Sequence, residues 1–287
     1  MRKPAYFTYI AARNKSSKSF LAVMLLFCAF CLASFIYFLV ENQIRNALMA
    51  LIFIFFVPLI YALEMGLKLR FVTPFISLVL FIALGSLLGS GYDLYTLVPW
   101  FDTLLHCISG FIFACLGFAI LELFIGEAEN KKSFAACLLF GFVFSLAIAL
   151  LWELFEYLGT HAFGLDMQED TVVNGFNSYL LSGTHAYTFD VEGITHTVIY
   201  FGNGQSVVID GYLDLGLIDT IADMAICLLG AVVYAVAIAI DWCKSKRKIL
   251  FKAFVPHLVV KICDTELEYK SAEQSIINDL CEEMEVK

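Results

Sequence analysis

The chain has 287 residues, of which 61% are hydrophobic and 16% are charged. Soluble domains carry roughly 45–50% apolar and about 25% charged residues, so this composition excludes a water-soluble globular protein. A net charge of −9 without a basic stripe argues against nucleic acid as a partner, and 28 Phe with only 5 Pro argue against a disordered chain. The composition is that of a polytopic membrane protein.

Long apolar runs mark the segments that we expect to cross the membrane. A helix of about 20 apolar residues spans the roughly 30 Å of hydrocarbon in a bilayer. The first three runs carry no charge, and the next three carry ionisable residues near one end. In chain order the six runs are 19–40, 46–63, 71–90, 101–120, 134–158 and 215–240. The sequence therefore predicts an all-α, polytopic membrane helix bundle with six transmembrane helices.

The distribution of Lys and Arg predicts how these helices are oriented. Basic residues concentrate in cytoplasmic loops. Seventeen of the 18 Lys and Arg residues fall on one side of the predicted bundle, and Arg45 is the exception. We therefore expect both termini in the cytoplasm. A cytoplasmic segment 1–18 would precede the transmembrane domain 19–241, and a cytoplasmic tail 242–287 would follow it.

One connection, residues 159–214 before the last helix, is much longer than the others and is predicted to lie outside. It holds seven acidic residues and no Lys or Arg. Residues 194–201 and 205–209 favour strands and flank Asn203-Gly204, a pair typical of the two-residue turn of a β-hairpin. Because long ordered loops are often functional, this loop either covers a site as a lid or is a solvated acidic segment.

Three pairs of ionisable residues lie near one end of the last three predicted helices. The members of each pair are three or four residues apart and therefore share one helix face. The pairs are Asp102 with His106, Glu153 with Glu156, and Asp219 with Asp223. In the predicted orientation, every pair lies within roughly 10 Å of the outer end of its helix. A common depth for three pairs predicts one shared site.

The predicted site combines five carboxylates and one imidazole with no Lys or Arg in the same three helices. A charge in the bilayer costs at least about 2.5–3.5 kcal/mol, so these groups should face the bundle interior and find partners there. Oxygen ligands with one imidazole suit a divalent metal ion such as Mg, Mn, Ca or Zn. The alternatives are a proton- or cation-coupled pathway and structural hydrogen bonding between helices.

The same residues carry a resemblance to known proteins. Five short segments resemble those of the YjdF-like bacterial membrane proteins, namely 101–106, 109–110, 152–156, 219–223 and 230–231. That group is similar in turn to the VanZ-like family, whose pattern runs Asp-x-x-x-His, a Glu, then Asp-x-x-x-Asn. Position 223 is Asp here, where the VanZ-like pattern has Asn. The resemblance covers about residues 92–231 and implies a multi-pass protein of the bacterial cytoplasmic membrane.

These features together predict an envelope protein that contacts membrane lipids and binds a cation. Our leading hypothesis is a metal-dependent hydrolase or transferase that acts on lipid-linked envelope substrates. In that mechanism the metal lowers the pKa of a bound water, and Glu153 serves as the general base. The alternatives are a proton- or cation-coupled transporter, and a non-catalytic envelope or sensory protein.

Overall fold

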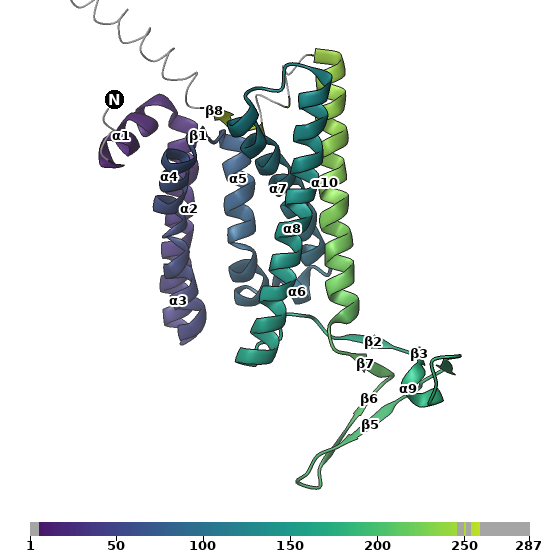
Figure 1. Ribbon diagram of the computed structural model, residues 1–287. Helices are drawn as coiled ribbons and strands as arrows, with labels where there is room; N and C mark the ends of the chain where they lie inside the picture. Colours follow the sequence, from purple (N-terminus) through teal and green to yellow (C-terminus); the bar gives the residue numbers. More distant parts are fainter. Residues whose placement is uncertain (1–5, 246–249, 251–253, 259–287) are drawn as a thin grey trace, which may run out of the picture. The chain divides into compact units, whose positions relative to one another are not determined.

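The computed structural model describes residues 6–245, 250 and 254–258, so most of the predicted tail 242–287 lies outside the described residues. Within the described residues, five helical segments are long and apolar enough to cross a membrane. They are α2 (Lys18–Val40), the pair α3 (Ile44–Phe53) and α4 (Phe56–Leu67), α7 (Phe101–Ile125), α8 (Lys131–Phe163) and α10 (Leu217–Ser245). Figure 1 shows α2 running alongside α3 and α4. The expectation of a multi-pass helical protein is confirmed.

The third predicted crossing, residues 71–90, does not form one long helix. It forms α5 (Thr73–Ala83), a helix of 11 residues, and a π-helical turn, Leu87–Gly91. At about 1.5 Å per residue, α5 alone covers only about half of the hydrocarbon core. A Cβ on Gly89 would lie 2.2 Å from the ring of Tyr95, so this ring packs directly against the glycine backbone where regular helix has ended. The expectation of six regular spanning helices is therefore not confirmed.

The two ends of this third segment contact opposite ends of α2. At its start, the hydroxyl of Thr73 lies 3.0 Å from that of Ser19 in the first turn of α2. At its end, Tyr92 stacks on Tyr37 with ring centroids 5.7 Å apart. The Tyr92 hydroxyl also lies 2.9 Å from that of Ser34. Residues 73–92 therefore run from the beginning of α2 almost to its end, a distance of about 27 Å along an α-helix.

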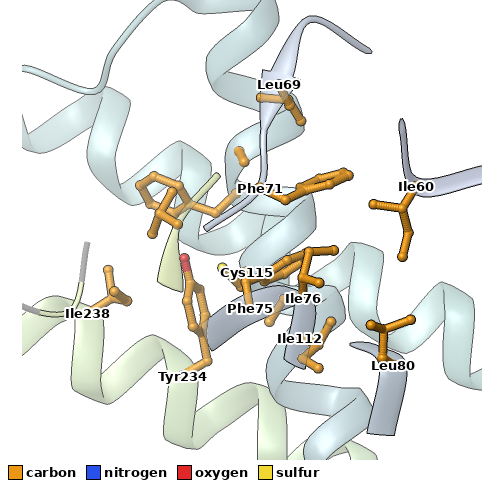
Figure 2. Close-up of a cluster of buried hydrophobic side chains, with 14 of the residues drawn as sticks. Ile60, Leu69, Phe71, Phe75, Ile76, Leu80, Ile112, Cys115, Tyr234 and Ile238 are labelled. Atoms are coloured by element: carbon orange, nitrogen blue, oxygen red, sulfur yellow. The ribbon is translucent and has the colours of Figure 1, made fainter. Parts of the chain in front are cut away.

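The chain divides into two compact units, residues 1–145 with 228–287 and residues 146–227. The core of the first unit brings together side chains from α5, α7 and α10, as Figure 2 shows for Phe75, Ile112 and Tyr234. The helices also approach closely at small residues. A Cβ on Gly230 would lie 2.0 Å from the carbonyl oxygen of Cys107, so only glycine permits this contact.

Both ends of the first unit's described chain fold onto the α4–α5 connection. The N-terminal helix α1 (Tyr6–Ser16) reaches this connection through Arg13, whose guanidinium donates a 2.8 Å hydrogen bond to the carbonyl of Phe71. Within the connection, β1 (Leu69–Arg70) pairs antiparallel with β8 (His257–Leu258) from the tail. The N-terminal segment, the α4–α5 connection and the start of the tail therefore meet at one end of this unit.

The second unit contains the C-terminal half of α8, the long loop and the first turns of α10. Helix α8 continues to Phe163, beyond the predicted end at residue 158, so the irregular loop begins later than expected. Three antiparallel strand pairs follow: β2 (Thr171–Val173) with β7 (Tyr212–Asp214), β3 (Phe176–Ser178) with β4 (Phe189–Val191), and β5 (Thr197–Tyr200) with β6 (Ser206–Ile209). A short helix, α9 (Tyr179–Ser182), follows β3.

The β5–β6 pair is the predicted hairpin, and its two strands lie side by side in Figure 1. Tyr200 pairs with Ser206, and the backbone N–H of Phe201 donates a 2.8 Å hydrogen bond to the carbonyl of Gln205, so residues 202–204 form a three-residue turn where the sequence predicts a two-residue one. Gly204 has φ +85°, whereas Asn203 does not adopt the positive φ that the two-residue turn requires. The left-handed conformation of Gly204 is readily adopted by glycine, which is why a glycine commonly occupies the last position of a three-residue hairpin turn.

Candidate functional site

In the C-terminal half of α8 the buried face is polar and the exposed face is apolar. Glu153 and Glu156 are only 5% and 8% exposed, whereas Leu154 and Phe155 between them are 50% and 54% exposed. A surface helix of a water-soluble protein shows the opposite arrangement, with its apolar stripe toward the core. The inverted pattern fits a helix that is surrounded by lipid and turns its carboxylates toward the protein interior.

Asp223 of α10 joins these two glutamates to form a group of three buried carboxylates, which we call the carboxylate trio. Asp223 is 5% exposed. One carboxylate oxygen from each of Glu153, Glu156 and Asp223 lies within 4.8 Å of the other two. The indole N–H of Trp152 donates a 2.8 Å hydrogen bond to Oε1 of Glu156. Three carboxylates at this distance repel one another unless protons or a cation lie among them.

Asp219, one helical turn before Asp223, contacts the loop. Its Oδ2 accepts a 2.9 Å hydrogen bond from the backbone N–H of Glu169. The neighbouring Gln168 is held twice, because its backbone N–H donates to the hydroxyl of Thr160 and its side-chain amide donates to Thr220 over 2.6 Å. Residues 165–170, which we call the strap, are thereby fastened to the end of α8 and the start of α10. Asp219 thus positions the strap.

The remaining two predicted site residues lie in the first unit, on α7. His106 Nε2 is 3.6 Å from Asp102 Oδ1, as expected for residues one turn apart on one helix face. The side chain of His106 is 8% exposed and that of Asp102 is 28% exposed. That this pair joins the carboxylate trio in a single cavity stays a prediction from the sequence.

A groove in the second unit adjoins the carboxylate trio, and we call it the α8–α10 groove. Its cavity volume is about 380 Å³. The walls are largely apolar and include Leu150 and Leu154 of α8. Glu153 lines the groove and also belongs to the trio. Gln168 of the strap lines it as well, so the long loop contributes to this cavity.

The second unit has a strongly one-sided charge. Residues 146–227 contain 11 Asp and Glu and no Lys or Arg. In the loop, burial and then the neighbouring carboxylates of Asp166 and Asp214 raise the pKa of Asp170 above its ordinary value. A field of a single sign around a recess raises the local concentration of ions of the opposite sign, so this unit attracts cations.

The sequence pattern did not reveal a buried ion pair in the first unit. Arg13 is 5% exposed and Glu64 is fully buried, and Arg13 Nε lies 3.0 Å from Glu64 Oε2. Both side chains also bind the backbone of Phe71. The carbonyl of Phe71 accepts a 2.8 Å hydrogen bond from Arg13, and the N–H of Phe71 donates a 2.8 Å hydrogen bond to Glu64. From the sequence, Arg13 counted only as a basic topology residue and the second apolar run ended at residue 63. The sequence feature that could have indicated this ion pair is Glu64 itself, a glutamate directly after an apolar run.

Tyr9 completes this ion-pair site. Its hydroxyl donates a 3.0 Å hydrogen bond to Oε2 of Glu64. Burial, followed by the charge of Glu64, raises the pKa of Tyr9 well above its ordinary value. Tyr9 therefore remains a protonated donor at neutral pH, and it helps to fasten α1 to α4.

Apolar spanning helices with polar residues on their buried faces define a multi-pass membrane protein. The model of the family described as "Predicted membrane protein (DUF2238)" matches residues 20–243, and the chain belongs to this family. Comparison with curated proteins and with solved structures gives no match. The resemblance to YjdF-like and VanZ-like proteins stays a prediction.

Proposed function

We propose that this protein is a six-span protein of the bacterial cytoplasmic membrane that binds a divalent cation through Glu153, Glu156 and Asp223. The observation that carries the proposal is the convergence of these three buried carboxylates within 4.8 Å. Carboxylate oxygens are the ligands that hard divalent cations prefer, and a bound cation would offset the mutual repulsion of the trio. No Lys or Arg in residues 146–227 competes for that role.

The contacts of the third segment support six crossings. Residues 73–92 begin beside Ser19 and end beside Tyr37, so they traverse the same distance as the spanning helix α2. With six crossings both termini lie on one side of the membrane. The shared end formed by α1, β1 and β8 supports this arrangement, and the Lys and Arg distribution favours the cytoplasm as that side.

Cysteine labelling tests the orientation. In a cysteine-free background, Asn177→Cys and Gln205→Cys should react with a membrane-impermeant thiol reagent in intact cells, because both positions are exposed residues of the external loop. Lys131→Cys, in the first turn of α8, should react only after the cells are permeabilised. Reversed labelling would overturn the orientation and the outward position of the trio.

The reaction that we propose is metal-dependent hydrolysis or transfer on a lipid-linked envelope substrate. A bound divalent cation would supply an activated water. Glu153 is the candidate general base because, within residues 146–227, it belongs to the trio and also lines the groove that a substrate would enter. Cation-coupled transport is the competing proposal, and it is supported by the acidic field of the same unit.

Elemental analysis and fluorescence test the cation site directly. We expect about one divalent ion per chain in protein purified without chelator. Trp152 is a natural reporter because its indole N–H is bonded to Glu156. In a Trp100→Phe, Trp242→Phe background, Mn²⁺ added to chelator-treated protein should change the emission of Trp152 saturably. A folded protein that carries no metal and shows no such response to Mg²⁺, Mn²⁺, Ca²⁺ or Zn²⁺ would refute the proposal.

A further inference from the structure

The α8–α10 groove has apolar walls that are continuous with the surface facing lipid. Leu150 and Leu154 line the groove and are 52% and 50% exposed. Such exposure is expected for side chains of a spanning helix that meet hydrocarbon. An apolar chain can therefore pass from the bilayer into the groove without crossing water. The volume of about 380 Å³ falls in the range of small-molecule sites.

The polar groups of the groove suit a cation. Within residues 146–227, all of which the structure describes, Glu153 is the only carboxylate that lines the groove, and no Lys or Arg is present. Gln168 is 8% exposed and offers its amide oxygen, while Thr220 accepts the side-chain amide of Gln168 and the ring of His161 also lines the groove. An ammonium group carries three donors and no acceptor, so it matches the Glu153 carboxylate together with the amide oxygen of Gln168. An anionic headgroup would meet Glu153 with no Lys or Arg of this unit to balance it.

We propose that the α8–α10 groove binds an amphiphile that carries a protonated amine on an apolar chain. The amine binds at Glu153, and the chain lies against Leu150 and Leu154. Because Glu153 also belongs to the carboxylate trio, amine binding and divalent-cation binding compete. The predicted competition rests on the proposed function, because it requires the divalent-cation site. Amine binding by itself does not require the metal.

The probe is dodecylamine at pH 7, with the full chain in lipid nanodiscs that have been stripped of metal. The nanodiscs with protein should retain dodecylamine above the level of empty nanodiscs. Dodecanol, which has the same chain without charge, and dodecanoate, which has the opposite charge, should be retained no more than by empty discs. Butylamine should bind about tenfold more weakly or worse, because its short chain buries little apolar area.

Matched variants separate the groove from the rest of the fold. Glu153→Gln keeps the shape of the side chain and removes its charge, so the affinity for dodecylamine should fall about tenfold or more. Leu154→Trp fills the groove and should also lower the affinity about tenfold or more. Leu151→Trp is the control, because Leu151 is on the same helix and 59% exposed but does not line the groove. It should bind dodecylamine as the unmodified chain does.

The outcomes distinguish this inference from the proposed function. Equal retention of dodecylamine by empty and protein-containing discs, or equal binding of dodecylamine and dodecanoate, would overturn the amine site even if the protein binds Mn²⁺. Unchanged affinity in both Glu153→Gln and Leu154→Trp would also overturn it. If dodecylamine binds at Glu153 and Mn²⁺ does not bind at all, the amine site stands and the metal site falls. If both bind, Mn²⁺ should weaken dodecylamine binding in the unmodified protein.

Discussion

Asp223→Asn is expected to lower the affinity for divalent cations by more than about 100-fold, since even second-shell changes at metal sites cost 10–100-fold. The same variant should be more stable than the unmodified chain when metal is absent. Two ionised carboxylates within 4.8 Å of each other repel by at least about 3.5 kcal/mol at an effective dielectric constant of 20, and removing one charge relieves this repulsion within the trio. Metal content and thermal unfolding in detergent, with chelator and with Mn²⁺, measure both effects.

Asp210→Asn is the matched control for this experiment. Asp210 lies in the same unit but is exposed in the loop. Its removal should leave the metal content unchanged and the unfolding temperature nearly unchanged in both conditions. If Asp223→Asn kept its metal and its unfolding temperature, Asp223 would leave the site, and structural hydrogen bonding between helices would be the better account of the trio.

The second large effect is expected at the ion pair between α1 and α4. Glu64→Ala should lower the free energy of unfolding by about 3–5 kcal/mol, because it leaves the guanidinium of Arg13 buried without its carboxylate. The double variant Arg13→Met, Glu64→Leu should recover only part of this loss, since it avoids burying a lone charge but removes the hydrogen-bond partners of the Phe71 N–H and carbonyl. Denaturant unfolding of the full chain in detergent measures the three stabilities.

Arg45→Ala is the control for loss of a basic side chain. Arg45 is exposed on α3, so this change should alter the stability by no more than about 0.5 kcal/mol. A Glu64→Ala protein as stable as the Arg45→Ala protein would contradict the view that the ion pair holds α1 against α4. The Mn²⁺ response of Trp152 should be preserved in all of these variants, because the ion pair lies in the first unit and the reporter lies in the second.

The sequence by itself determined the features that depend on local composition and spacing. Length and apolar content identify the long helices, because a hydrocarbon layer of set thickness imposes a minimum run of apolar residues. Asn203-Gly204 predicts the β5–β6 hairpin because its turn requires a glycine at positive φ, which Gly204 adopts, and the structure differs only in closing the turn with three residues in place of two. The three-residue spacing of Glu153 and Glu156 places both on one face of α8, and the structure shows that this face is buried.

Only the tertiary structure decided the features that depend on contacts between distant residues. Arg13 and Glu64 are 51 positions apart, and no local pattern indicates that they form a buried pair. Asp219 and Asp223 are four residues apart, a spacing that predicts a shared role on one helix face. In the structure Asp219 holds the strap and Asp223 joins the trio, because the loop folds back over the start of α10. The third segment stops being a regular helix after Ala83, and the π-helical turn that follows packs Gly89 against the Tyr95 ring, a contact that apolar content alone does not encode. The hydropathy of a segment indicates whether water or lipid surrounds it. The ion pair, the strap and the end of the third helix depend instead on which side chains contact one another in the packed protein.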